Sequence, residues 1–235
     1  RTAGRRTSDG PLAFLLLLPL LGAFAACSTG RPVTGTSDAA RAGSFPRRAP
    51  TVASLTRREK AAQVVMVASR GVYRAEDDPE YLELARLVSE EGVGGVIWFL
   101  GTPLETADLN HRLNAKAKLP LLVAAALEAG PGMRFPDLVL GPSAMAVAAT
   151  GDTALAARRA RATAQAARAL GIRVVFAPVA DVNNDPDNPV INVRSFGERP
   201  EAVGSFVAAT VAGLQEGGVL VTLKHFPGHG DTNVD

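Results

Sequence analysis

Residues 94–126 read GGVIWFLGTPLETADLNHRLNAKAKLPLLVAAA, and this stretch decides the fold. It opens with an uninterrupted apolar run, Gly94–Leu100. In the TPLE sequence that follows, Thr102 and Glu105 match a helix capping box, with a proline where the first helical turn tolerates it. A second apolar run closes the stretch at Leu121–Ala126. Two apolar runs of strand length around one helix predict a βαβ unit with buried parallel strands.

The same alternation continues on both sides of this unit. Further apolar runs predict strands at Gln63–Ala68, Val174–Val179 and Val219–Leu223. Another capping box, Thr56 with Glu59, predicts a helix start before the first strand. Glycines mark the ends of three other predicted helices, which cover residues 81–91, 152–170 and 200–216.

Five repeated βα steps predict an α/β fold. Such repeats are compatible with an open doubly wound sheet or with a closed barrel, and periodicity alone does not separate the two. A complete (β/α)8 barrel takes about 250 residues. If the fold is a barrel, we therefore expect the region from Leu55 to Asp235 to stop after about its fifth strand.

The composition suits an ordinary globular domain and narrows the possible functions. Of the 235 residues, 47% are hydrophobic and 20% are charged, with a net charge of only +2. The arginines are scattered, and no basic stripe is interleaved with aromatic residues. We therefore expect no nucleic-acid partner.

The first residues have the pattern of an export signal. The positively charged sequence RTAGRR precedes an apolar run at residues 12–26, which ends at Cys27, the only cysteine of the chain. The sequence FAAC around that cysteine resembles a bacterial lipobox. We predict that residues 1–27 form a lipoprotein-type signal peptide with a lipidated Cys27. A plain secretory signal and a transmembrane anchor are the alternatives, although the run is short for a span of about 20 residues and Pro19 interrupts it.

Residues 28–54 are rich in Ser, Thr, Gly, Pro, Ala and Arg and lack a hydrophobic period, which predicts a flexible tether. The folded domain is expected at residues 55–235. The lipid anchor would hold this domain at a membrane, on the periplasmic or extracellular face of a bacterial cell envelope.

The densest cluster of polar side chains follows the last predicted strand, where residues 224–232 read KHFPGHGDT. Lys224 and His225 come at the strand end, the place where barrel enzymes build their sites, and both can donate hydrogen bonds to ligand oxygens. The two glycines let the backbone approach a ligand closely. We expect Asp231 and Thr232 to hydrogen-bond the turn. The other candidate of this active-site loop is His229.

Three other interpretations of this loop have less support. His225 and His229 have the spacing of a helical zinc site, but the proline and glycines between and after them disfavour a helix. The lysine precedes the glycines, unlike in a phosphate-binding P-loop. A tight βα loop with incidental polar residues is the third possibility.

A second polar segment, residues 181–197 (DVNNDPDNPVINVRSFG), follows the strand predicted at Val174–Val179. Structureless connections of this length are usually functional. Arg194 is the candidate ligand-binding residue, because a guanidinium group binds hydroxyl and acetamide oxygens well. The alternative is an ordinary ion pair with Asp181 or Glu198. The spacing of the acidic residues does not match a calcium-binding EF-hand loop.

Three motifs together resemble glycoside hydrolase family 3, in particular its β-N-acetylglucosaminidase branch. They are FAPVADVN at 176–183, RSFG at 194–197 and KHFPGHGDT at 224–232. The resemblance runs from about Leu55 to the last residue. It implies a TIM-like (β/α)8 barrel that hydrolyses terminal β-linked N-acetylglucosaminides with retention, without metal or organic cofactor.

The resemblance also implies roles for individual residues. Lys224, His225 and Arg194 match the family's sugar contacts. Asp235 matches the aspartate of an Asp-His dyad whose histidine is the general acid/base. Retaining hydrolysis needs that acid/base and a nucleophile. The histidine would fall two residues after Asp235 and the nucleophile on a later strand, so this chain alone is expected to be inactive.

One position departs from the family pattern. After the third strand the family carries A-x-D-x-E-G-G, and Ala126 stands here at the aspartate position. The leading hypothesis is a cell-envelope β-N-acetylhexosaminidase acting on peptidoglycan-type or chitin-type glycans that contain N-acetylglucosamine. A non-catalytic sugar-binding relative and a β-glucosidase-like member of the same family are the alternatives.

Overall fold

The computed structural model describes residues 51–234, so Cys27, Asp235, the predicted signal peptide and most of the predicted tether lie outside the described residues. No helix among residues 51–234 is long and apolar enough to cross a membrane. The α-helices are α1 (Arg57–Gln63), α2 (Pro79–Arg86), α3 (Pro103–Lys116), α4 (Ala144–Ala148), α5 (Thr153–Ala169) and α6 (Pro200–Glu216). A π-helix (Leu87–Glu91) continues α2, and short 3-10 turns lie at Val52–Ser54, Pro131–Met133 and Asn192–Arg194. The strands are β1 (Met66–Gly71), β2 (Gly95–Gly101), β3 (Leu122–Ala125), β4 (Val174–Val175) and β5 (Leu220–Val221).

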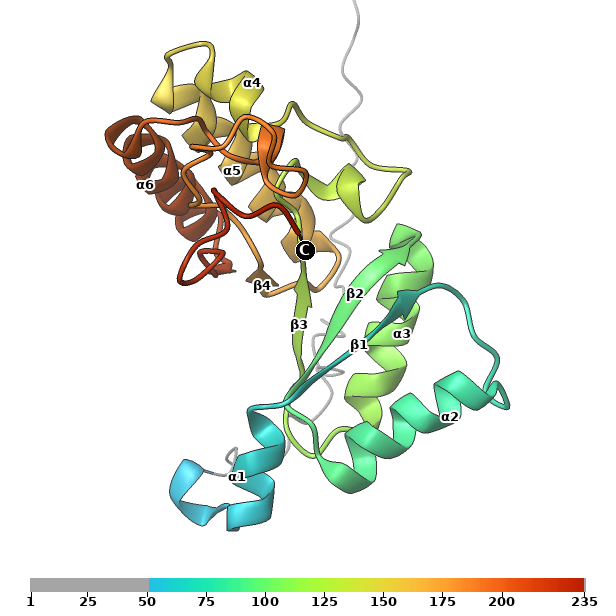
Figure 1. The fold of residues 1–235 in the computed structure, drawn as a ribbon. Helices are drawn as coiled ribbons and strands as arrows, with labels where there is room; N and C mark the ends of the chain where they lie inside the picture. Colours follow the sequence, from blue (N-terminus) through green and yellow to red (C-terminus); the bar gives the residue numbers. More distant parts are fainter. Residues whose placement is uncertain (1–50, 235) are drawn as a thin grey trace, which may run out of the picture. The chain divides into compact units, whose positions relative to one another are not determined.

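The five strands form one parallel sheet in chain order, each hydrogen-bonded to the next (Figure 1). Doubly wound sheets reverse their strand order at a switch point, whereas a barrel adds each strand beside the last. The order β1-β2-β3-β4-β5 therefore answers the question that periodicity left open. The prediction of an α/β fold with the first five strands of a TIM-like barrel is confirmed.

Strands β4 and β5 are shorter than the sequence predicts. The apolar run after Val174 continues to Val179, but regular pairing stops at Val175. Pro178 has no N–H to donate, and the Ala177 N–H donates within its own segment to the Val175 carbonyl at 3.0 Å. Pairing resumes at one parallel bridge, between Val179 and Lys224. This bridge brings the chain after β4 beside the chain after β5.

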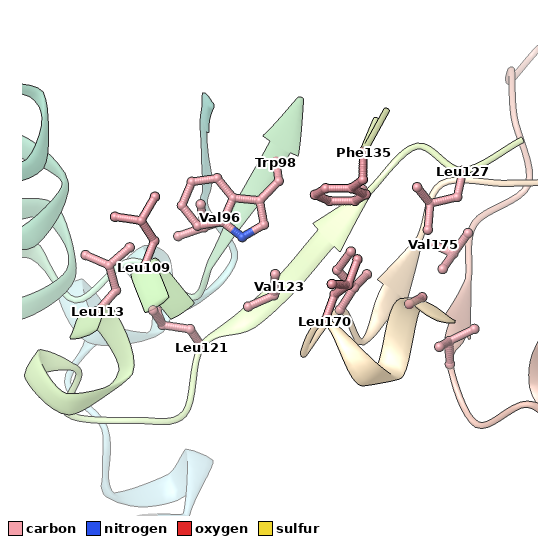
Figure 2. Packing of buried hydrophobic residues seen from close by; sticks show 14 of the residues in the cluster. Val96, Trp98, Leu109, Leu113, Leu121, Val123, Leu127, Phe135, Leu170 and Val175 are labelled. Carbon is pink, nitrogen blue, oxygen red and sulfur yellow. The ribbon is translucent and has the colours of Figure 1, made fainter. Parts of the chain in front are cut away.

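Helices pack on one face of the sheet and bury a core. Figure 2 shows Trp98 and Val96 of β2 close to Leu109 of α3. The Trp98 side chain is fully buried, and its Nε1–H donates to Asn110 Oδ1 at 2.8 Å. Asn110 Nδ2 in turn donates to the Leu170 carbonyl at 2.8 Å, just after α5. One buried amide therefore joins strand β2, helix α3 and the end of helix α5.

The prediction that the strands are buried on both faces holds only in part for the face opposite this core, where Ala124 and Val174 are buried and other side chains are not. Phe99, Leu122 and Leu220 are 45%, 44% and 59% exposed. Successive side chains of a strand point to opposite faces. The exposed side chains therefore lie on the face opposite the one that carries Trp98.

Helix starts follow the predicted caps. Thr56 and Glu59 form the full reciprocal capping box at α1. At α3 the Thr102 side chain accepts from the Glu105 N–H, as in a capping box. The return bond differs, because Glu105 Oε2 accepts from the Thr102 hydroxyl at 2.8 Å and not from the Thr102 backbone N–H. Gly92 follows the π-helix with φ of 74°, the left-handed conformation expected after a helix end.

Helices α5 and α6 lie side by side (Figure 1) and position the segment that carries the RSFG motif. A Cβ on Gly213 would lie 2.2 Å from the Ala157 carbonyl oxygen, so this close approach requires glycine. The ring of Phe196 stacks on Phe206 of α6, with 5.5 Å between ring centroids. This apolar contact anchors the chain two residues after Arg194.

Candidate functional site

Polar side chains from three neighbouring strands meet at the carboxyl ends of the sheet. Glu128 follows β3, Asp181 follows β4, and Lys224 and His225 follow β5. Arg194 joins them from the last residue of the 3-10 turn at Asn192–Arg194. We call these five residues the carboxylate network, because its two acidic members, Glu128 and Asp181, hold the other three.

Glu128 is the centre of the network. Its carboxylate receives Arg194 in a bidentate pair, with Nε to Oε2 at 2.9 Å and Nη2 to Oε1 at 3.0 Å, and also forms an ion pair with Lys224. The side chain is only 8% exposed. Burial raises the pKa of Glu128, but the hydrogen bonds and positive charges of Arg194 and Lys224 lower it more, so the pKa lies below its ordinary value. Glu128 is therefore a fixed anion that orients two cations.

The ion-pair partner of Arg194 differs from the two partners considered from the sequence. Asp181 and Glu198 were the candidates, whereas the structure places the Glu128 carboxylate against the guanidinium. The reason is the strand order, because β3 and β4 are neighbours and their following loops meet. Arg194 Nη1 also donates to the Val190 carbonyl at 3.0 Å. The Arg194 side chain keeps 30% exposure, which leaves part of its fork accessible to a ligand.

Asp181 fixes the histidine of the network. Its side chain is fully buried. Oδ2 accepts from the His225 backbone N–H at 3.1 Å and from His225 Nδ1 at 2.6 Å, while Oδ1 accepts from the His229 N–H at 2.7 Å. With Nδ1–H donating to the carboxylate, His225 Nε2 faces away from Asp181 and lies 3.5 Å from Arg194 Nη2. The imidazole is therefore oriented toward the accessible side of the network.

The segment 181–197 is ordered by hydrogen bonds of its own buried side chains. Asn188 Nδ2 donates to the His229 carbonyl at 2.7 Å, and its Oδ1 accepts from the Ile191 N–H at 2.7 Å. The Ser195 hydroxyl donates to the Asp181 carbonyl at 2.6 Å. The bond to His229 joins this segment to the loop after β5, and the other two fix the segment internally, so the connection supports Arg194.

The KHFPGHGDT loop folds tightly against the same segment. A Cβ on Gly230 would lie 1.7 Å from the Val182 carbonyl oxygen, and Gly228 has φ of 142°, so both positions require glycine. His229 Nδ1 bonds the Thr232 hydroxyl, which also donates to the His229 carbonyl at 3.1 Å. Asp231 is exposed and makes no hydrogen bond within residues 51–234, so Thr232 and not Asp231 holds the turn.

Sequence reasoning did not single out two residues of this region, Glu128 and Arg134. Glu128 had a detectable signal, because it stands at the glutamate position of the A-x-D-x-E-G-G pattern. Asp181 was considered from the sequence only as an ion-pair partner of Arg194, whereas the structure shows it bonded to His225. Arg134 follows the turn at Pro131–Met133, stacks its guanidinium on Phe99 at 5.3 Å from the ring centroid, and donates from Nε to the Ala126 carbonyl at 3.3 Å.

Two further points concern Asp235 and metal binding. Asp235, the expected partner of a catalytic histidine, lies outside the described residues. No group of three or more His, Cys, Asp or Glu side chains within residues 51–234 could hold a metal ion. The network itself offers hydrogen-bond donors around a fixed anion, which suits a neutral polar ligand rich in hydroxyl and amide oxygens.

Comparison with known proteins gives consistent matches. Residues 56–235 match the model of the glycosyl hydrolase family 3 N terminal domain. β-Hexosaminidase A of Pseudoalteromonas piscicida is 41% identical over 167 residues, covering 65% of this chain and 28% of that protein. β-Hexosaminidase LpqI of Mycobacterium tuberculosis is 35% identical over 238 aligned positions, covering 93% of this chain and 59% of that protein.

A solved structure agrees with these matches. The family 3 β-N-acetylglucosaminidase from Paenibacillus sp. FPU-7 superposes with a TM-score of 0.68 at 38% identity, covering 77% of this chain and 35% of that one. The chain thus spans less than two thirds of the length of each of these relatives. The family model, the relatives and the parallel five-stranded sheet agree, and the chain belongs to glycoside hydrolase family 3, within its N-terminal domain.

Proposed function

We propose that the protein containing this chain hydrolyses terminal β-linked N-acetylglucosamine residues with retention. The observation that carries the proposal is the carboxylate network, in which Glu128 holds Arg194 and Lys224 while Asp181 orients His225. The names of relatives at 35–41% identity, both β-hexosaminidases, support the substrate class.

The network is suited to bind a sugar ring. Arg194 and His225 have side-chain exposures of 30% and 32%, so each can reach a ligand while its other contacts stay buried. Donors held on a fixed anion lose little freedom when they bind hydroxyl and acetamide oxygens. Protonation of the leaving oxygen is assigned in this proposal to a histidine oriented by Asp235, with a separate carboxylate as nucleophile.

The test is hydrolysis of a chromogenic N-acetyl-β-glucosaminide by the full-length protein. We expect turnover that falls by about a hundredfold or more in Asp235→Ala, since general acid–base catalysis contributes about 10²–10⁴-fold. Exposed Asp187→Asn is the matched control and should keep wild-type turnover. Absence of turnover in the wild type contradicts the proposal, and preference for the matching glucoside points to a β-glucosidase-like enzyme.

Ala126 favours a second candidate, a sugar-binding relative without turnover. The residue follows β3 beside Glu128 and brings only a methyl group to the site. A sugar hydroxyl left there without an acceptor would cost about 1–3 kcal/mol. If the wild type binds N-acetylglucosamine without hydrolysing a glucosaminide, and Ala126→Asp gains turnover, the sugar-binding function is supported.

We further propose that the protein is an exported lipoprotein of the cell envelope that acts on peptidoglycan-type glycans. The support is the apolar run at residues 12–26 before Cys27 and the tether composition of residues 28–54. In a bacterial host, wild-type protein should sediment with membranes and incorporate labelled palmitate. Cys27→Ser should be released into the soluble fraction without label, and membrane retention of that variant would refute lipidation.

A further inference from the structure

A second hollow, distinct from the carboxylate network, lies against β1 and β2. This cavity of about 630 Å³ is lined by Ala68 and Ser69 of β1 and by Phe99 and Leu100 of β2. Arg134 contacts the ends of two strands, because its carbonyl accepts from the Gly101 N–H of β2 at 3.2 Å and its Nε donates to the Ala126 carbonyl after β3 at 3.3 Å. Ala126 is two residues before Glu128, so Arg134 links the lining of the cavity to the segment that carries Glu128.

The charges that line the cavity are unbalanced. Arg70, Arg74 and Arg134 contribute guanidinium groups, and Glu80 contributes the one carboxylate. Glu80 forms an ion pair with Arg74. Within residues 51–234 no carboxylate contacts Arg70 or Arg134. The cavity thus presents two uncompensated cations at the end of the sheet.

Arg74, which also lines the cavity, has a buried donor without a protein partner among the described residues. Its side chain is 10% exposed and lies against Asp78 Oδ1 at 3.4 Å, yet its Nε is buried without any hydrogen-bond partner among the described residues. A buried guanidinium donor left unsatisfied is costly, about 1–3 kcal/mol. An acceptor oxygen in the cavity would satisfy it.

Phe99 and Ala126 surround the Arg134 side chain without adding a negative charge. The ring of Phe99 lies under the Arg134 guanidinium and limits its movement without neutralising it. At Ala126 the chain after β3 offers a methyl group and no carboxylate near the Arg134 side chain. Pre-oriented, uncompensated guanidinium forks match the paired oxygens of carboxylate, phosphate or sulfate groups.

We propose that this cavity is a subsite for an oxyanion group, phosphate, sulfate or carboxylate, carried by the sugar ligand and bound by Arg70 and Arg134. The inference rests on the proposed function, because it takes the network as the place where the sugar ring binds. The full-length enzyme would then prefer glycans with an acidic substituent over neutral ones.

The experiment is calorimetric titration of the full-length protein with N-acetylglucosamine and with N-acetylglucosamine 6-phosphate. We expect the phosphorylated sugar to bind at least about tenfold more tightly, the effect of one charge-assisted hydrogen bond. In Arg70→Gln the ratio of the two dissociation constants should fall toward one. Arg58→Gln is the matched control, since Arg58 is an exposed arginine on α1 paired with Glu91, and it should keep the wild-type ratio.

The outcomes separate this inference from the proposed function. Equal affinity for the two sugars, no binding of either, or a preference that survives in Arg70→Gln overturns the anion subsite, even if a neutral glucosaminide is hydrolysed. Titration with inorganic phosphate identifies the source of the anion. Arg70-dependent affinity equal to that of the sugar phosphate assigns the subsite to the free anion, and weaker affinity assigns it to a substituted sugar.

Discussion

Two parts of the same sheet are held together by different means. Strands β2 and β3 pair over four consecutive residues, and Trp98 packs their helix-facing side against α3. Strands β4 and β5 pair over only two residues. Beyond that point the chain is held by the buried carboxylate of Asp181, which accepts the backbone N–H groups of His225 and His229.

This difference separates stability from function. In the first part, apolar packing and backbone pairing stabilise the fold, and the groups involved face away from the ligand side. In the second part, Asp181 holds the backbone, and Asp181 and Glu128 together orient the side chains that face a ligand. We therefore expect substitutions in the first part to lower stability alone, and substitutions in the second part to lower stability and ligand binding together.

Trp98→Ala should have the largest effect on stability. The side chain is fully buried, and its removal creates a cavity and leaves Asn110 Oδ1 without its donor. We expect a loss of about 4 kcal/mol in the free energy of unfolding. The folded protein should keep its affinity for N-acetylglucosamine, because Trp98 faces α3. Thermal unfolding and calorimetric titration of the full-length protein check both expectations.

Trp98→Phe is the matched control for this substitution. It keeps most of the ring volume and removes the Nε1–H, so the loss should be nearer the 1–3 kcal/mol typical of an unsatisfied buried acceptor. A sugar affinity that falls in either Trp98 variant would break the comparison, since the core would then be coupled to the site.

Asp181→Asn should come next in stability and should also reduce binding. The amide puts a donor where the carboxylate accepts from His225 Nδ1, His225 N–H and His229 N–H, so at least one buried donor loses its acceptor. We expect a loss of about 3 kcal/mol in stability and at least about tenfold weaker binding of N-acetylglucosamine. Asp187→Asn, an exposed position in the same segment, should change neither quantity. Binding that survives in Asp181→Asn would show that the orientation of His225 is not needed.

The parts of the fold that the sequence predicts correctly depend on local signals. The N-cap at Thr56 and the helices predicted at residues 152–170 and 200–216 lie where the sequence places them, because helix starts and ends depend on residues a few positions apart. The strand order was not predictable in this way. It follows from which strands pair, and apolar runs carry no information about their neighbours.

In the candidate site, too, local motifs were predictable and long-range contacts were not. Lys224, His225 and Arg194 are recognisable from motifs, but the residue that joins Lys224 to Arg194 is not. Glu128 is 66 positions from Arg194, and their contact exists only because β3 lies beside β4.

Glu128→Gln should have the smallest effect on stability of the three substitutions and the clearest dependence on pH. Removing one partner of a fully buried ion pair costs about 3–5 kcal/mol, and the partial exposure of Arg194 and Lys224 reduces the expected loss here to about 2 kcal/mol. Because the pKa of Glu128 is lowered in the folded protein, its charge stabilises the fold fully above the unfolded value of about 4.3. That contribution is lost as the pH falls through the folded pKa.

The difference in thermal stability between wild type and Glu128→Gln should therefore be constant from about pH 7 to pH 5 and shrink below about pH 4.3. Exposed Glu90→Gln, on the π-helix, is the matched control and should show no such difference. Sugar affinity should fall in Glu128→Gln at neutral pH, because Arg194 and Lys224 lose their common anchor. A stability difference that does not change with pH would mean that Glu128 acts through its shape and hydrogen bonds alone. A loss of stability without a loss of sugar affinity would mean that Glu128, like Trp98, stabilises the fold without contributing to binding.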